Sequence, residues 1–305
     1  MSKYETEVSP GNPNASQSVL LELAGSDRRV LDVGCGGGGL ARALARQGCT
    51  VSGVDMDLEA VEEARGSLEE VLIGNLEDLD LVGHFGEQSF DVVVFGDVLE
   101  HLRRPDAVLR EAARLLRPGG SVVLSVPNVA HGDLRLLLLA GFWDYRDLGL
   151  LDETHIRFFT HSGVRRLLAL AGFTATEFRR VRVPLFGTEL GVHREHFPPE
   201  VVAFVEGSPE SETYQFVVRA YPANLDGDLV QLRRTVDDLE DKVVELETTL
   251  RDLQKHAVTL TEERDVERGR ADVLAQEIGS LRGLWLFRLS RAPRRVYAAL
   301  RAPRG

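Results

Sequence analysis

Short apolar runs alternate with amphipathic stretches along residues 15–222. The runs are rich in β-branched residues and predict seven strands, at 29–33, 50–54, 71–73, 90–95, 121–126, 174–181 and 212–221. Apolar positions three or four apart predict helices at 16–24, 40–47, 58–68, 105–116 and 163–171. Strands that are apolar throughout and separated by helices are buried on both faces. The pattern therefore predicts an α/β domain with a doubly wound, mostly parallel seven-stranded sheet of the Rossmann-like kind, preceded by a disordered polar segment at 1–14.

A different period begins at residue 228. Apolar residues then fall alternately three and four positions apart, with Leu at every d position of five unbroken heptads. The phase continues through one polar layer, at Arg264 and Glu267, to Leu281. Opposite charges at facing g and e′ positions, such as Lys242 and Glu247, favour a two-stranded parallel coiled coil over residues 228–281, and hence a homodimer. A solitary helix folded back on the domain would show a wider apolar stripe.

Charge is unevenly distributed along the chain. The 36 Lys and Arg against 48 Asp and Glu give a net charge of −12, which argues against nucleic acid as a partner, because phosphates need a basic face. Residues 282–305, in contrast, carry seven Arg and no acid among Trp, Phe, Tyr and Leu. Such a basic amphipathic tail suits an anionic membrane surface. The alternatives are a disordered tail or one that docks on the acidic domain.

The sequence predicts neither a membrane span nor a secretory signal. No run approaches about 18 apolar residues, and the N-terminus lacks an apolar signal region. We therefore expect a cytoplasmic protein, held peripherally at the inner face of the cell membrane if the tail binds lipid. The two cysteines, Cys35 and Cys49, show no CxxC spacing, so we expect neither a disulfide framework nor a metal site.

The first predicted strand runs directly into a glycine-rich turn, residues 34–39. A nucleotide-like ligand binds at this place in doubly wound folds, because backbone amides at the helix start face it. The glycines alone fit a dinucleotide fingerprint and an acidic-x-Gly-x-Gly-x-Gly loop equally well. Asp32 favours the second, since its charge repels a pyrophosphate and suits a ligand with an ammonium or sulfonium group. Asp55, after the second strand, is placed to bind ribose hydroxyls in both cases.

Six stretches together resemble the class I S-adenosylmethionine-dependent methyltransferases, in particular the ubiquinone- and menaquinone-biosynthesis-like group. They are VLDVGCGGGGLARALARQG, VSGVDMD, GNLEDL, FDVVVFGDVLEHL, LREAARLLRPGGSVVLSVPN and HIRFFTHSGVRRLLALAGF, in the family's order, and they span about half of the chain, residues 28–175. The resemblance implies S-adenosylmethionine as the cofactor. It implies contacts with the methionine end of the cofactor from Asp32, Gly34, Cys35 and Gly36, and with its ribose and adenine from Asp55, Met56, Asn75 and Leu76. Asn75 departs from the family, which more often has Asp there, so weaker adenine binding is expected.

The loops after the fourth and fifth strands, 96–101 and 127–131, end at the same edge of the sheet and predict the acceptor site there. The long, aromatic-rich stretch 133–160 is expected to act as a lid. Two histidines on these segments are the candidate general bases, because histidine titrates near neutral pH: His101 and His155. A structural bond to a backbone carbonyl is an equal alternative for His101. His131 is a weaker candidate for the base, and Asp97 or Glu153 could orient an imidazole.

These observations predict a methyltransferase that acts on an oxygen of a saccharide or glycan, or of a small hydroxylated compound. Two alternatives stay open. An NAD-dependent oxidoreductase shares the glycine loop and Asp55, but Asp32 counts against it. A non-catalytic scaffold with a decayed methyltransferase domain is disfavoured by the intact loop, although Asn75 leaves an opening.

Overall fold

The computed structural model describes residues 11, 12, 14–223 and 227–299, without the side chains of 227–238 and 282–299 and of a few residues between them. The chain divides after Lys242 into two compact units. The N-terminal segment predicted to be disordered lies largely outside the described residues. Its last residue is nevertheless fixed, because the Asn14 amide donates to the Arg182 carbonyl at 2.7 Å and accepts from the Arg182 N–H at 2.6 Å.

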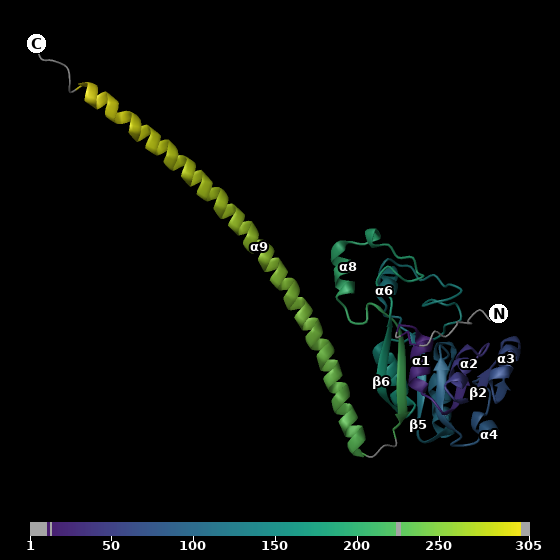
Figure 1. Ribbon diagram of the computed structural model, residues 1–305. Coiled ribbons are helices and arrows are strands. Elements are labelled where there is room, and N and C mark those ends of the chain that lie inside the picture. The colour runs from purple at the N-terminus through teal and green to yellow at the C-terminus, as the bar shows by residue number, and fades with distance from the viewer. Residues whose placement is uncertain (1–10, 13, 224–226, 300–305) are drawn as a thin grey trace, which may run out of the picture. The chain divides into compact units, whose positions relative to one another are not determined.

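The first unit is a sheet with helices on both faces (Figure 1). Its strands are β1 (Arg29–Val33), β2 (Thr50–Asp55), β3 (Glu70–Ile73), β4 (Phe90–Gly96), β5 (Leu116–Pro127), β6 (Phe173–Arg182) and β7 (Thr213–Pro222). Its helices are α1 (Ser16–Ala24), α2 (Gly39–Arg46), α3 (Leu58–Ala64), α4 (Leu81–Phe85), α5 (Pro105–Leu115), α6 (Gly132–Leu139), α7 (His161–Leu170) and α8 (Pro199–Glu206), with single 3₁₀ turns η1 (Arg65–Ser67), η2 (Leu99–His101) and η3 (Arg194–His196).

The sheet has the order β3-β2-β1-β4-β5-β7-β6. All neighbouring pairs are parallel except those of β7, which runs antiparallel to both β5 and β6. The predicted mostly parallel, doubly wound seven-stranded sheet is therefore confirmed. The strand order reverses between β1 and β4, and ligands of such sheets bind outside the carboxyl ends of the strands at that switch point.

Alternate residues of the central strands supply the core on each side of the sheet. Leu31 of β1 and Phe95 of β4 belong to the buried cluster that includes α4, α5 and α7. Val30 and Val94, one position away on the same strands, belong to the cluster that includes α1 and α2. This period of two, apolar on both faces, explains why the strands appear as unbroken apolar runs in the sequence.

The predicted lid is more ordered than a loop. It contains α6, and a second insertion between β6 and β7, which contains α8, packs on it through a separate apolar cluster. The members of this cluster include Leu134, Leu136, Leu150, Leu190 and Val205. The sequence GDLRLLLL of α6 is so uniformly apolar at its end that it shows no helical period, which is why the pattern missed this helix. The two insertions together form a cap on one end of the domain (Figure 1).

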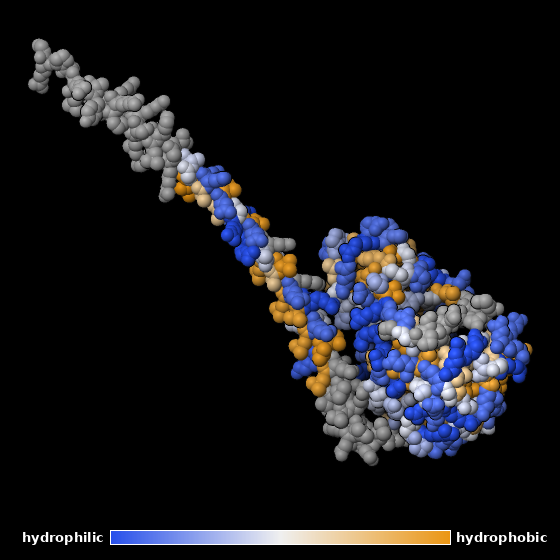
Figure 2. All heavy atoms as spheres, viewed as in Figure 1, coloured by the Kyte–Doolittle hydropathy of each residue, from blue (hydrophilic) through white to orange (hydrophobic). Residues whose placement is uncertain are grey.

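The chain from residue 227 forms one helix, α9 (Gly227–Ala299), of 73 residues. The prediction of a single continuous helix is confirmed; the pairing of two such helices stays a prediction. Apolar residues line the described part of α9 (Figure 2), and the d-position residues Leu246, Leu253 and Leu260 are each about 60% exposed. The side chains of the predicted amphipathic tail lie outside the described residues. Among the helices described, none is both long and apolar enough to cross a membrane.

Candidate active site

The turn after β1 has a backbone that requires glycine at one position and stays open at another. Gly34 has φ +75°, and a Cβ there would lie 2.5 Å from Cγ2 of Val98. Its N–H donates to the Val54 carbonyl at 2.7 Å, which holds the turn against β2. Gly36 has φ +47°, with open space where a Cβ would lie. The turn is therefore packed on one side and leaves room for a ligand on the other.

Asp32 lies one residue before the end of β1, with a carboxylate that the protein does not neutralise. The residue is 3% exposed, and its Oδ2 has no hydrogen-bond partner among the described residues. Burial, and then the nearby charge of Asp55, raise its pKa to about 7. A buried carboxylate oxygen without a hydrogen-bond partner destabilises the folded protein. A cationic ligand in the turn would supply the missing partner.

Asp55 ends β2, and its carboxylate is fixed by two backbone donors. The N–H of Gly36 donates to Oδ2 at 2.7 Å, and the N–H of Asp57 donates to Oδ1 at 2.9 Å. Each oxygen keeps a second lone pair. The carboxylate is therefore oriented in advance and can still accept bonds from two hydroxyl groups of a ribose.

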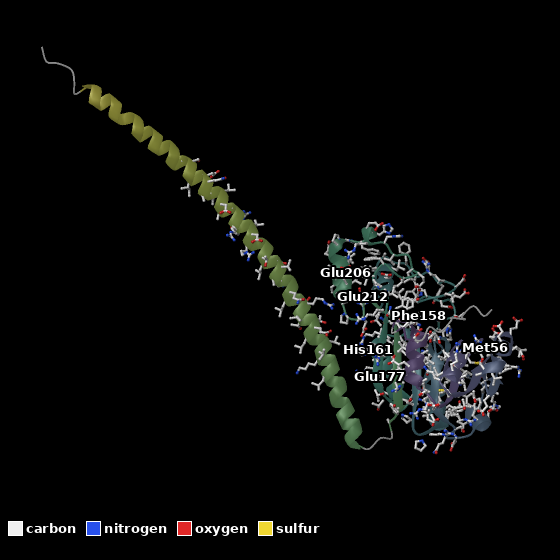
Figure 3. The ribbon with its side chains drawn as sticks, viewed as in Figure 1. Met56, Phe158, His161, Glu177, Glu206 and Glu212 are labelled. Atoms are coloured by element: carbon white, nitrogen blue, oxygen red, sulfur yellow. The ribbon has the colours of Figure 1, made fainter. Side chains whose placement is uncertain are left out.

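The remaining residues predicted to contact the cofactor have different surroundings. Met56 is 73% exposed, beside the carboxyl end of β2 (Figure 3), and so presents a free apolar side chain. The Asn75 amide accepts from the Glu77 N–H at 3.1 Å and donates to Asp78 at 2.9 Å. Leu76 packs against the core. The Cys35 thiol is buried against Gly53, so only the backbone of Cys35 can serve a ligand.

These features fit S-adenosylmethionine. Asp32 offers an unneutralised carboxylate to an ammonium group, Asp55 offers two oriented oxygens to ribose hydroxyls, and Met56 offers an apolar surface to a purine. A pyrophosphate at the same turn would lie close to the charge of Asp32. The donor set thus favours a methyltransferase cofactor over NAD.

Asp97 directly follows β4; it has a left-handed backbone conformation and accepts two side-chain hydrogen bonds. Asp97 has φ +56°, a left-handed conformation that costs about 1–2 kcal/mol in residues other than glycine. Its Oδ1 accepts from Ser125 Oγ at 2.8 Å and from Gln215 Nε2 at 2.9 Å. Burial raises its pKa. Asp97 is thus held by β5 and β7, and its charge interacts with that of His101.

The two candidate bases, His101 and His155, lie next to each other. Their ring centroids are 4.9 Å apart at an interplanar angle of 65°. His101 ends η2, and His155 comes from the cap, so the tertiary fold brings together residues 54 apart in the chain. His155 is 8% exposed, and its pKa is lowered by burial and by the proximity of His101. It is therefore neutral near pH 7 and able to accept a proton.

Thr154, a residue of the cap, contacts the His101 imidazole. Its Nδ1 lies 3.2 Å from the Thr154 carbonyl oxygen and 3.1 Å from Thr154 Oγ1. Thr154 Oγ1 in turn donates to the buried Asp152 carboxylate at 2.6 Å. Both readings of His101, base and backbone-bonded group, are compatible with this geometry. Glu153, which was expected to orient an imidazole, shows only a backbone bond to Arg146.

His131 is a structural residue. It is fully buried; Nδ1 accepts from the Asp133 N–H at 3.2 Å, and Nε2 lies 2.9 Å from the Val183 carbonyl. It caps α6 and fixes the two insertions to each other. With both nitrogens engaged, it does not serve as a base.

Sequence reasoning missed Glu100, which lies between Leu99 and His101 in η2. The residue is fully buried, and neither carboxylate oxygen has a hydrogen-bond partner among the described residues. Burial, and then the nearby charge of Asp97, raise its pKa well above its usual range. The sequence gives no sign of this, because a glutamate in a 3₁₀ turn is ordinarily exposed.

Comparison with known proteins gives a consistent result. The family described as "Methyltransferase domain" matches residues 13–177. A ubiquinone biosynthesis O-methyltransferase of Psychrobacter arcticus is 31% identical over 178 residues, which cover 56% of this chain and 68% of the relative. The enzyme of the same name from Xanthomonas euvesicatoria is 44% identical over 119 residues, 36% of this chain and 47% of its own. For this second relative, the chain spans about half of its length.

Solved structures resemble the chain more distantly. A SAM-dependent methyltransferase from Archaeoglobus fulgidus is 18% identical, with a TM-score of 0.49 over 69% of this chain and 94% of its own. A Burkholderia thailandensis 1,6-didemethyltoxoflavin-N1-methyltransferase, solved with its substrate and S-adenosylhomocysteine, is 21% identical, with a TM-score of 0.45 over 69% of this chain and 80% of its own.

Proposed function

The chain belongs to the methyltransferase domain family, and on that premise we propose that it transfers a methyl group from S-adenosylmethionine to a hydroxyl oxygen of a saccharide or a small hydroxylated compound. One observation carries the proposal: the buried carboxylate of Asp32, whose Oδ2 has no hydrogen-bond partner among the described residues, lies beside an open glycine turn and the oriented carboxylate of Asp55. This combination suits a ligand that has both a cationic and a ribosyl part.

The protein residues divide the binding of this cofactor among themselves. Asp32 accepts the ammonium group, Asp55 holds the ribose hydroxyls, and Met56 covers one face of the adenine. When bound, the cofactor supplies a methyl group on a sulfonium, whose carbon–sulfur bond breaks as the new oxygen–carbon bond forms, leaving a neutral thioether. The chain's contribution is then to align the acceptor and to exclude water, effects that together reach about 7–11 kcal/mol in favourable cases.

The acceptor end supplies groups that take up a proton. A hydroxyl nucleophile must lose its proton during transfer, and a positioned base accelerates such a step by about 10²- to 10⁴-fold. His101 and His155 lie side by side where the β4 loop meets the cap. Burial and the proximity of His101 lower the pKa of His155, which favours the neutral imidazole that a proton acceptor requires.

The surroundings of the two histidines favour an acceptor with a ring. Phe158 lies edge-on to Trp143 at 5.2 Å and to His155 at 6.5 Å between ring centroids. Phe142, Tyr145 and Phe158 are each at least one-third exposed. Aromatic faces of this kind bind the apolar faces of sugars and other flat rings. The names of the curated relatives, which are O-methyltransferases, support oxygen as the acceptor atom.

The direct test uses cofactor labelled in its methyl group. The full chain is incubated with an extract that has been fractionated into glycan, lipid and small-molecule pools. We expect label in one pool, in a form that resists mild alkaline hydrolysis, as a methyl ether does, and no label with Asp55→Ala. Alkali-labile label would mean a carboxylate acceptor, and label in none of the pools would contradict the proposed reaction.

We further propose that two chains pair in parallel through α9. The Leu, Val and Ile side chains that the structure describes at its a and d positions, from Leu239 to Leu281, are each at least 50% exposed. A second copy would cover this stripe and would place opposite charges at facing g and e′ positions. Sedimentation of the full chain tests the pairing: Leu246→Glu with Leu253→Glu yields monomers, whereas Val258→Glu, exposed but off the stripe, leaves the dimer intact. A monomeric wild-type chain would contradict the pairing.

The basic tail at 282–305 is proposed to bind anionic lipid surfaces. Its sequence supports this, with seven Arg interleaved with large apolar residues. The full chain should sediment with vesicles that contain phosphatidylglycerol, and a chain ending at 281 should not. Equal sedimentation of the two chains would contradict a role for the tail.

A further inference from the structure

Glu100 has a buried carboxyl group for which the described residues supply no hydrogen-bond partner. It is fully buried at the carboxyl end of β4, and both of its oxygens lack partners. Its backbone carbonyl accepts two N–H groups of the cap, from Ile156 and Arg157, each at 2.9 Å. The residue is therefore fixed in place while its carboxylate stays unsatisfied. An unsatisfied buried carboxylate requires a proton, a water molecule or a cation.

Two imidazoles surround this carboxylate. The donor atoms of Glu100, His101 and His155 all lie within 4.8 Å of one another. Donors bound to one zinc-like ion in tetrahedral geometry, at about 2.0–2.2 Å each, lie about 3.3–3.6 Å apart. The three side chains therefore need to move closer together by up to about 1.5 Å to share one ion.

Both histidines are oriented as metal ligands commonly are. A ligating histidine usually donates its second ring N–H to a backbone carbonyl or a carboxylate, which fixes the ring and its tautomer. His101 directs Nδ1 at the Thr154 carbonyl, 3.2 Å away. His155 forms a backbone hydrogen bond with Leu150, whereas its Nδ1 is buried without a partner. Each ring is thus fixed from outside the cluster by one backbone group.

We propose that Glu100, His101 and His155 bind one divalent transition-metal ion, of the class that includes zinc, manganese and iron. Two nitrogens and one oxygen form a donor set that suits these ions and not magnesium or calcium, which prefer oxygen ligands only. Three protein ligands leave further coordination positions for other donors, as in catalytic metal sites.

A bound ion would restrict the chemical class of the methyl acceptor further than the proposed function does. This inference about the acceptor rests on that function. With one carboxylate and two neutral imidazoles, the site keeps a net charge of about +1. Such an ion would lower the pKa of a hydroxyl bound to it; with both imidazoles engaged as ligands, the O–H proton would then pass to solvent and not to a histidine. An ion that expands to five ligands would have two positions for the acceptor, which favours an acceptor with two adjacent oxygens, a catechol or a vicinal diol of a sugar.

Metal binding is measured without any acceptor. The untagged full chain, freed of metal by a chelator, is titrated with Zn²⁺ by calorimetry and with Co²⁺ by visible absorption. We expect one ion per chain. The visible spectrum of bound Co²⁺ should be typical of an ion with fewer than six ligands. Affinity should fall at least about tenfold in Glu100→Gln and in His155→Ala, since even loss of an outer-shell partner costs about 10- to 100-fold.

Two controls keep this experiment decisive. His193→Ala alters another pair of neighbouring imidazoles, His193 and His196, which are exposed and have no part in the cluster; its affinity for Zn²⁺ should match that of the wild type. Circular dichroism identifies any variant that fails to fold, and His155→Ala, from the cap, then replaces Glu100→Gln. Absence of a stoichiometric ion, or unchanged affinity in both folded variants, overturns the site.

Titration of the same preparations with S-adenosylhomocysteine separates the two proposals. Binding of S-adenosylhomocysteine without binding of Zn²⁺ leaves the methyltransferase standing and removes the metal site. Binding of Zn²⁺ without binding of S-adenosylhomocysteine removes the proposed reaction and leaves the metal site.

Discussion

The cofactor end and the acceptor end of the domain are built in different ways. Asp32, Gly34 and Asp55 come from two adjacent strands and one turn, and backbone hydrogen bonds fix them. Glu100, His101 and His155 meet only because the cap folds over the β4 loop. Each end has a buried carboxylate oxygen without a partner, on Asp32 and on Glu100. Two adjacent strands and one turn can therefore position the cofactor, whereas the acceptor site forms only when the cap folds over the β4 loop.

The largest expected effect separates the two ends by function. His101→Ala should lower kcat with the true acceptor by about 10²- to 10⁴-fold, because it removes a proton-accepting or metal-binding group. Its affinity for S-adenosylhomocysteine should be unchanged, because the residue lies at the acceptor end. Steady-state kinetics and calorimetry on one preparation check both parts; unchanged turnover would remove His101 from the reaction.

Asp55→Ala should weaken the binding of S-adenosylhomocysteine, the property that His101→Ala leaves unchanged. It removes two charge-assisted hydrogen bonds to the ribose, each worth about 1.5–3 kcal/mol, so affinity for S-adenosylhomocysteine should fall at least about 100-fold. Glu59→Ala, which removes an exposed carboxylate in the first turn of α3, is the matched control and should bind normally. If the two variants bound alike, Asp55 would not be the ribose ligand.

Gly34→Ala tests the contact that joins the two ends. The added methyl group would clash with Val98 of the β4 loop and would occupy a left-handed backbone position. We expect a loss of about 2–4 kcal/mol in the free energy of unfolding, measured with urea. Adding Val98→Ala should recover part of this loss, and Gly36→Ala, which meets open space, should cost less than Gly34→Ala. A double variant as unstable as the single one would contradict the clash.

Asp32→Asn should bind less tightly and fold more stably. Loss of the charged bond should weaken binding of S-adenosylhomocysteine by about 10- to 100-fold. The pKa of Asp32 is raised on folding from 3.8 to about 7. The folded state therefore holds its proton more tightly than the unfolded state, and stability falls as pH rises through this window. Above pH 7 the variant avoids that cost, roughly 1.4 kcal/mol per pKa unit, and should melt at a higher temperature than the wild type at pH 8.

The smallest effect is a pH dependence confined to the cofactor end. A cationic ligand prefers the ionised Asp32, so the affinity for S-adenosylhomocysteine should fall as pH drops below about 7, at most tenfold per unit. Calorimetry from pH 5.5 to 8.5 measures this slope. Asp32→Asn should flatten it, and a slope that persists in that variant would point to another group.

The same contrast decides what the sequence could predict. Asp32, the glycine turn and Asp55 were predicted because their roles depend on neighbours within the β1–β2 unit. The seven strands were located because each is apolar on both faces. Glu100 was missed because its surroundings include the cap, whose Ile156 and Arg157 N–H groups bond to its carbonyl from far along the chain. The insertion that carries α8 was missed for a related reason, since it is stabilised by packing on α6 and not by its own period.

The central claim is that this domain binds S-adenosylmethionine through Asp32 and Asp55, and titration of the full chain with S-adenosylhomocysteine tests it most directly. We expect one bound molecule per chain, with a dissociation constant in the micromolar range, and no binding of NAD. No binding of S-adenosylhomocysteine at millimolar concentration, or binding of NAD in its place, would contradict it.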